Sequence, residues 1–176
     1  QRVLTLEQEG NQEVRIARRL DDGHPLWKVA EATKWHDMMS GTGPRSTPTL
    51  HQGKIYVLFS NGRLSSVDAN SGEVLWNTQT LGQDYDFPEW GISLSPMLWN
   101  DRIILNLGGE HSAAQAYSKN SGDLIWSSRL QGRGVYLSPE ILPLLGEDHL
   151  LVAVEGKVAG LNPNNGETLW EKPWKI

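Results

Sequence analysis

The chain has 176 residues, and its 18 glycines and 9 prolines with 38% hydrophobic residues are typical of a turn-rich β protein. The net charge of −5 argues against nucleic-acid binding, which needs a basic surface, and no apolar stretch is long enough for direct membrane insertion. Cysteine is absent, which excludes disulfides and thiolate chemistry. Eight tryptophans against two phenylalanines indicate that tryptophan has a repeated structural use.

A seven-residue segment recurs four times along the chain. Each copy has Asn or Asp two places before a glycine, and a tryptophan four places after that glycine. Such a segment makes a tight reversal, because Asn and Asp tolerate left-handed backbone and glycine takes a positive φ without penalty. The glycine and tryptophan of each copy are Gly23 and Trp27, Gly72 and Trp76, Gly122 and Trp126, and Gly166 and Trp170.

The segments between these turns predict short strands. The first copy begins directly in strand-like sequence, and its Val3 aligns with Ile55 of the second copy, so it lacks an opening strand. Each later copy opens at a Ser-Pro or Thr-Pro step, at Pro48, Pro96 and Pro139, and continues into an apolar strand. No stretch has the 3.6-residue periodicity of a helix.

Four antiparallel strands in a repeat of about 40–50 residues are the pattern of a β-propeller blade. The sequence therefore predicts an all-β chain with about four four-stranded blades, the first of them incomplete. We place the blades at residues 1–32, 46–80, 94–130 and 137–174 of a single propeller region that spans 1–176. The longest loops lie at 33–46 and 81–94, where a propeller keeps its variable surface.

The stretch Ser66–Trp76 resembles the tryptophan-docking repeat of the pyrrolo-quinoline quinone (PQQ)-like β-propeller family. This resemblance extends over nearly the whole chain. It implies that each of the four tryptophans lies flat over a peptide of the neighbouring blade and is a structural residue. Arg19 and Ser118 stand where the family usually has Asp, so we expect those two turns to lack a bracing side-chain bond.

Family members usually close a ring of seven or eight blades. The resemblance therefore implies either that the chain is about half of a longer propeller or that two copies complete one ring. An open fan of blades exposes sheet edges and apolar faces. We expect the remainder of the propeller or a second copy to close the ring.

Candidate binding residues precede the opening strands of the later blades. Arg45, Trp90, Arg133 and Tyr136 fall there, at the expected rim of the central funnel. Arginine and large aromatic residues gathered at a concave surface are typical of a binding hot spot. The alternative is that Trp90 and Tyr136 pack between blades while Arg45 pairs with an acidic neighbour.

The chain has no recognisable catalytic motif, and we expect no metal and no cofactor. Its five histidines occupy unrelated repeat positions, which does not favour a shared metal site. Asp84, Asp86 and Glu89 have a spacing that superficially suits calcium, but a calcium site needs about six oxygen ligands. A solvated acidic loop is the alternative.

The resemblance admits more than one function, because the family includes both quinoprotein alcohol dehydrogenases and non-catalytic outer-membrane assembly lipoproteins. We predict a non-enzymatic module that binds or scaffolds a protein or peptide. The resemblance implies a periplasmic, secreted or cell-envelope location. The first alternative is a dehydrogenase that uses PQQ and calcium, and the second is a sensor or accessory domain of a larger protein.

Overall fold

The computed structural model describes residues 1–174, which form β-strands and no helix, so they contain no helix long and apolar enough to cross a membrane. A first sheet has three strands, and three further sheets have four strands each, all antiparallel and in sequence order. The first sheet comprises β1 (Arg2–Glu9), β2 (Gln12–Arg19) and β3 (Pro25–Glu31). The second comprises β6 (Thr49–His51), β7 (Lys54–Leu58), β8 (Arg63–Asp68) and β9 (Val74–Gln79).

The third sheet comprises β10 (Met97–Trp99), β11 (Arg102–Asn106), β12 (Ala114–Ser118) and β13 (Leu124–Ser127). The fourth comprises β14 (Glu140–Leu144), β15 (Glu147–Val154), β16 (Lys157–Leu161) and β17 (Thr168–Pro173). These bounds fall inside the four predicted blade ranges, and each four-stranded sheet opens just after its Ser-Pro or Thr-Pro step. The prediction of an all-β chain with an incomplete first sheet is confirmed.

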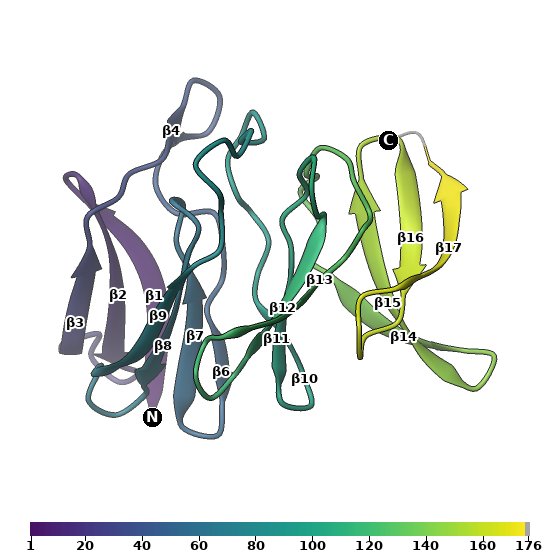
Figure 1. Cartoon of the computed structure of the whole chain (residues 1–176). Coiled ribbons are helices and arrows are strands. Elements are labelled where there is room, and N and C mark those ends of the chain that lie inside the picture. Colours follow the sequence, from purple (N-terminus) through teal and green to yellow (C-terminus); the bar gives the residue numbers. More distant parts are fainter. Residues whose placement is uncertain (175–176) are drawn as a thin grey trace. The chain divides into compact units, whose positions relative to one another are not determined.

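The strands belong to two compact units. One unit contains residues 1–83 and 89–95, and the other contains 84–88 and the described residues from Pro96 onward. Figure 1 labels the sheets β1–β3 and β6–β9 of the first unit and β10–β13 and β14–β17 of the second. In addition to these sheets, the first unit has a small hairpin of β4 (His36–Asp37) and β5 (Gly41–Thr42), which the sequence analysis did not predict.

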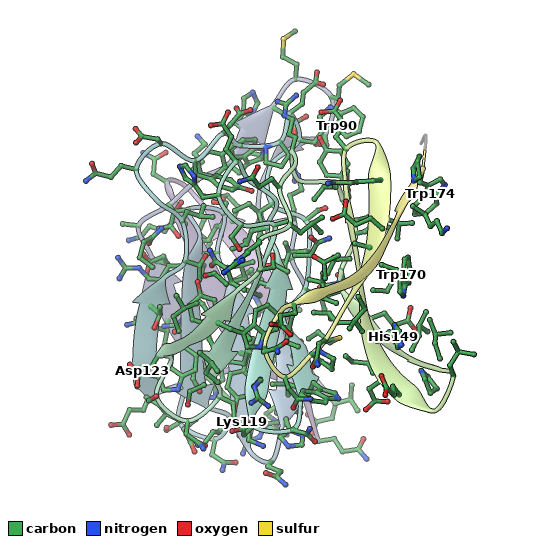
Figure 2. All side chains as sticks on the ribbon, turned by 45° about the vertical axis from the view of Figure 1, so that its right-hand side comes forward. Trp90, Lys119, Asp123, His149, Trp170 and Trp174 are labelled. Atoms are coloured by element: carbon green, nitrogen blue, oxygen red, sulfur yellow. The ribbon has the colours of Figure 1, made fainter. Side chains whose placement is uncertain are left out.

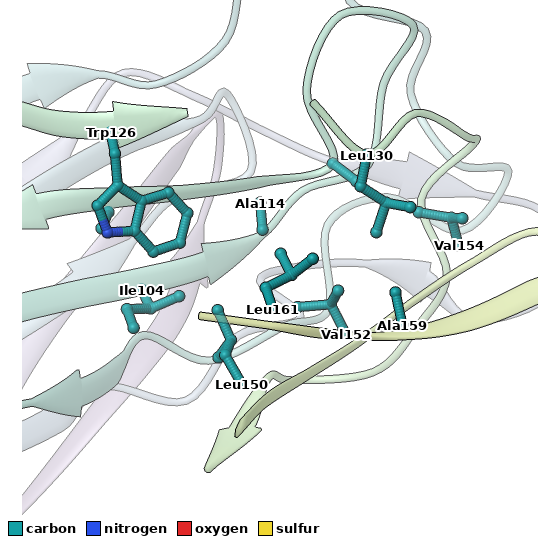
Figure 3. Close-up of a cluster of buried hydrophobic side chains, with 11 residues drawn as sticks. Ile104, Ala114, Trp126, Leu130, Leu150, Val152, Val154, Ala159 and Leu161 are labelled. Atoms are coloured by element: carbon teal, nitrogen blue, oxygen red, sulfur yellow. The ribbon is translucent and has the colours of Figure 1, made fainter. Parts of the chain in front are cut away.

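Each unit has an apolar core between its two sheets. In the first unit, buried Ile55, Val57, Phe59 and Val67 of the second sheet are packed against Leu4, Leu6, Trp27 and Ala69. In the second unit the core is formed by the buried side chains shown in Figure 3, among them Ile104, Trp126, Leu150, Val152 and Leu161. The continuous apolar runs of β7, β11 and β15 contribute to these cores, through Ile55 and Val57 of β7, Ile104 of β11, and Leu150, Val152 and Val154 of β15.

The four predicted turn glycines all have the left-handed backbone that the turn requires, with φ of 73°, 77°, 79° and 74° at Gly23, Gly72, Gly122 and Gly166. In the second sheet, Asp68 Oδ1 accepts hydrogen bonds from the backbone N–H groups of Asn70 and Ser71, both at 2.9 Å. The expectation that Ser118 leaves its turn unbraced is wrong. Its hydroxyl oxygen accepts the equivalent bonds from Asn120 and Ser121 at 3.3 and 3.2 Å, because a hydroxyl has lone pairs like a carboxylate.

At the corresponding turn of the first sheet, Arg19 cannot accept these bonds. Its guanidinium instead pairs with Asp21 at 2.6 Å and with Asp22 at 3.5 Å, within the turn itself.

Two of the repeated tryptophans contact the turn of the following sheet. Trp27 donates from Nε1 to the Ala69 carbonyl at 3.2 Å, and a Cβ on Gly72 would lie 2.6 Å from its ring. Trp126 donates to the Pro163 carbonyl at 3.2 Å, and a Cβ on Gly166 would lie 2.5 Å from that ring. The left-handed turn glycine is thus also the surface on which the indole lies.

The other two repeated tryptophans have neighbours in their own sheets. Trp76 lies near Tyr56, with ring centroids 6.2 Å apart. Trp170 donates to His149 Nδ1 at 3.0 Å and lies over Gly160, and Figure 2 shows Trp170 and His149 side by side.

A small residue stands opposite each repeated tryptophan in the strand ladder. The pairs are Ala17 and Trp27, Ser66 and Trp76, Ala116 and Trp126, and Gly160 and Trp170. The indole therefore has room to lie across the preceding strand.

Candidate binding site

Arg45 is held inside the loop that contains the β4–β5 hairpin. Its Nη2 lies 2.9 Å from Asp37 Oδ2, 2.8 Å from Ser40 Oγ and 2.9 Å from the Gly41 carbonyl, while Nη1 donates to the Gly43 carbonyl at 3.2 Å. The side chains of Asp37 and Arg45 are only 8% and 17% exposed. Of the two interpretations, pairing with an acidic neighbour describes the contacts of Arg45.

Asp37 is the centre of this hairpin. It accepts hydrogen bonds from the Ser40 hydroxyl, from the backbone N–H groups of Ser40 and Met39, and from Arg45. These bonds, the Ser40 hydroxyl first, hold the pKa of the Asp37 carboxyl well below its usual value. The carboxylate therefore stays ionised and keeps the hairpin closed at any physiological pH.

Trp90 lies in a segment that is anchored to the first unit by its neighbours. Gly91 packs against Trp35, whose ring would be 2.6 Å from a Cβ at that position, and Ile92 and Leu94 are buried. Trp90 itself remains partly exposed. The backbone on the C-terminal side of Trp90 is therefore held in place, so the large aromatic side chain projects from a fixed position.

Arg133 and the loop 84–88 form the corresponding region of the second unit. The guanidinium of Arg133 lies 3.5 Å from Asp86 Oδ2 and donates to the Phe87 carbonyl at 3.4 Å. Tyr85 anchors the same loop, because its hydroxyl donates to the Leu107 carbonyl at 2.5 Å and its ring meets Phe87 edge-on. Burial, reinforced by the nearby Asp86 charge, raises the pKa of Tyr85 to about 12.

Glycines allow close backbone packing next to Arg133. A Cβ on Gly132 would lie 2.6 Å from Val154, and one on Gly134 would lie 2.5 Å from the Leu107 carbonyl. The chain then reaches Tyr136, which is partly exposed. The backbone is therefore tightly packed on both sides of Arg133, which limits the conformations of the segment that leads to Tyr136.

The four predicted site residues are divided between the two units. Arg45 and Trp90 belong to the first unit, and Arg133 and Tyr136 belong to the second. Their role in binding stays a prediction. Pairing of Arg45 with an acidic neighbour was one of the two interpretations, but neither the partner Asp37 nor the β4–β5 hairpin was predicted, although the residues His36–Thr42 contain the turn signal Asp-x-x-Ser-Gly.

A pair of buried charged residues on β2 was also missed. Glu13 and Arg15 are 0% and 2% exposed. Glu13 accepts from the Ser60 backbone N–H at 3.1 Å, while Arg15 donates to Ser65 Oγ at 2.9 Å and lies over the Phe59 ring. Burial raises the pKa of the Glu13 carboxyl and lowers that of Arg15. Two buried ionisable groups thus take part in the polar contacts between the first two sheets.

The acidic residues do not assemble into a metal site. Within residues 1–174, no group of three or more His, Cys, Asp or Glu side chains is arranged to hold a metal ion. Asp86, the centre of the predicted acidic loop, faces Arg133 instead. These residues do not fit a calcium ion, and we derive no reaction step through calcium or quinone.

Comparison with known proteins gives relatives of two kinds. Quinoprotein alcohol dehydrogenase PedH of Pseudomonas putida is 26% identical over 139 residues, which are 74% of this chain and 23% of that protein. Outer membrane protein assembly factor BamB of Salmonella typhimurium is 28% identical over 87 residues, 48% of this chain and 22% of that protein. The chain thus spans about a quarter of the length of the curated relatives that it matches.

Solved structures share the fold. A europium-containing methanol dehydrogenase aligns over 99% of this chain and 44% of its own, with a TM-score of 0.66 and 13% identity. BamB of Moraxella catarrhalis aligns over 97% of this chain and 52% of its own, with a TM-score of 0.61 and 14% identity. Successive four-stranded antiparallel sheets with these neighbours define a protein with the β-propeller fold, as predicted.

The family itself follows from a further match. A family model described as outer membrane protein assembly factor BamB matches residues 10–175. The chain therefore belongs to this family of PQQ-like repeat proteins.

Proposed function

We propose that the chain forms part of a PQQ-like propeller that binds a protein or peptide in the cell envelope and carries out no redox reaction. The observation that carries this proposal is the match of residues 10–175 to a family described as an outer membrane protein assembly factor. An assembly factor acts through contacts with other proteins, and its location is at or near the outer membrane.

Trp90, Arg133 and Tyr136 are the side chains that we assign to binding. Each is partly exposed, and Trp90 and Arg133 have an anchored segment beside them. Rigid aromatic side chains contribute contact area with little loss of conformational entropy. Arg45 braces the hairpin of residues 36–42, and we propose no direct contact with the partner for it.

The four repeated tryptophans have a different role in this proposal. We assign Trp27, Trp76, Trp126 and Trp170, with their turn glycines, to the docking of one blade on the next. The contacts of Trp27 with Ala69 and of Trp126 with Pro163 support this assignment. Loss of a repeated tryptophan would therefore weaken binding only by destabilising the fold.

A second candidate function is that of a quinoprotein dehydrogenase. It is favoured by the similarity to PedH and to the quinoprotein ethanol dehydrogenase of Pseudomonas aeruginosa, which is 24% identical over 146 residues. In that case a metal ion would need ligands other than a group of three His, Cys, Asp or Glu side chains among the described residues.

Two measurements on the complete polypeptide distinguish the candidates. In the first, PQQ and calcium chloride are added with a primary alcohol, and the reduction of an artificial dye is followed. In the second, a photo-crosslinking amino acid replaces Trp90 or Tyr136 in the envelope of the producing cell, with the exposed turn residue Asn164 as control. We expect no dye reduction, and crosslinks to protein at 90 and 136 but not at 164. Dye reduction that a calcium chelator abolishes would overturn the proposal in favour of the dehydrogenase.

A further inference from the structure

Two adjacent methionines at the tip of the β4–β5 hairpin are almost completely exposed. Met38 is 99% and Met39 is 84% exposed, although most large apolar side chains of the chain are at least half covered. Figure 1 shows that this hairpin extends past the ends of β1, β2 and β3 in the same unit. A pair of exposed apolar side chains on a projecting tip is unfavourable in water unless another surface covers it.

The hairpin that carries the methionines is fixed in its conformation. Asp37 Oδ1 accepts from the backbone N–H groups of Met39 and Ser40 at 2.9 and 2.7 Å, and Arg45 closes the other side of the loop. His36 Nδ1 lies 2.8 Å from Thr42 Oγ1 across the base of the hairpin. The backbone at both methionines is therefore ordered before any partner arrives, which reduces the entropy lost on binding.

The charges of the hairpin favour a particular kind of surface. Asp37 is neutralised by Arg45, so the remaining charged or titratable groups on the hairpin and its base are the exposed Lys34 and His36. An apolar cleft with carboxylates at its rim would complement two methionines beside the positive charge of Lys34.

We propose that Met38 and Met39 insert into an apolar, acid-rimmed cleft of a partner protein, and that the Asp37–Arg45 pair is the brace that presents them. Methionine suits this role because its flexible, polarisable side chain adapts to irregular apolar pockets. This inference rests on the proposed protein-binding function, and it assigns to that function contact residues other than Trp90, Arg133 and Tyr136.

The test uses the complete polypeptide in its producing cell. A photo-crosslinking amino acid is placed at position 39, and at the fully exposed hairpin residue Leu145 as a matched control. Met38 is then changed to Ser, which removes the apolar side chain, or to Leu, which keeps it. Asp37→Ala opens the brace while leaving both positions exposed. Thermal unfolding of each variant shows whether the fold is retained. We expect this for the exposed positions 38 and 39, and also for Asp37→Ala, because β4 and β5 form a separate two-stranded sheet.

We expect one discrete protein crosslink at position 39 and none at 145. Met38→Ser should lower the yield of that crosslink about tenfold, because a buried apolar side chain is lost, whereas Met38→Leu should preserve it. Asp37→Ala should also lower the yield, because the tip is no longer preorganised.

Three results would overturn the inference. These are crosslinks only to lipid, equal crosslinks at 39 and 145, or a yield that is the same for Met38→Ser as for Met38→Leu. If the crosslinks at Trp90 and Tyr136 persist in these cases, the proposed function stands and only the hairpin assignment fails. If no position crosslinks to protein, both fail.

Discussion

A tryptophan and a glycine meet at the contact between the first two sheets, and the same geometry recurs between the last two. Gly72 has a φ of 77° and lies beneath Trp27, whereas Gly53 of the same sheet has a φ of 75° and nothing within 4 Å of a Cβ. Alanine at either position meets a similar backbone strain of about 1–2 kcal/mol. Only alanine at Gly72 must also displace an indole.

We therefore expect Gly72→Ala to lower the free energy of unfolding by about 1–3 kcal/mol more than Gly53→Ala, which is the usual cost of overpacking. Urea unfolding of the two variants measures the difference directly. Equal losses would mean that the indole moves aside without cost, and that Trp27 does not hold the two sheets together through this contact.

At the scale of elements, β2 brings Glu13 and Arg15 into the space between the first and second sheets. Because burial raises the pKa of Glu13, the folded protein binds a proton more readily there than the unfolded chain does. The resulting stability is fully present below the unfolded pKa of about 4.3 and is lost as the pH rises through the folded value.

Glu13→Gln removes this titration. We expect the unfolding free energy of the wild-type protein to fall relative to that of the variant as the pH rises from about 4 to 8. Paired denaturation curves across this range measure the change. A difference between the two proteins that is independent of pH would contradict the assignment of a raised pKa to Glu13.

The elements that the sequence predicted are those whose signals are local. Proline cannot donate to a strand ladder, so Pro48 and Pro96 mark strand openings, and the apolar run at Ile55 predicts a strand buried on both faces. The glycine turns were equally easy to predict, because the positive φ of each turn glycine depends on a few neighbouring residues. Sheet order and strand count could therefore be predicted almost completely.

The contacts of the candidate site were harder to predict, because no recognisable sequence pattern indicates them. Arg45 was placed on a binding rim by its position in the repeat, but its partner Asp37 lies in a loop with no periodicity to reveal it. The burial of Glu13 and Arg15 depends on the facing sheet, which the alternation of a single strand does not show. The bracing role of Ser118, in contrast, could have been foreseen, since serine is a common substitute for Asp in such turns.

At the scale of the whole molecule, stability in a stack of repeats is close to a sum of blade terms and of interfaces between neighbours. Trp126 is 7% exposed and contacts the following sheet, so Trp126→Ala should lower the free energy of unfolding by about 3–5 kcal/mol. Trp170 contacts His149 and Gly160 of its own sheet, so the same change should have a smaller effect as long as no further blade covers this tryptophan.

The comparison of Trp126→Ala with Trp170→Ala also tests how the propeller is completed. If a further blade of the same polypeptide covers Trp170, the two losses become similar at every protein concentration. If a second copy of the chain covers Trp170, the loss of unfolding free energy caused by Trp170→Ala grows with protein concentration, because the wild-type dimer must dissociate before it unfolds. Urea unfolding at two concentrations that differ about a hundredfold separates these cases, since binding then contributes up to roughly 2.7 kcal/mol. A small loss at Trp170 under all conditions would contradict our expectation that another blade packs on this face.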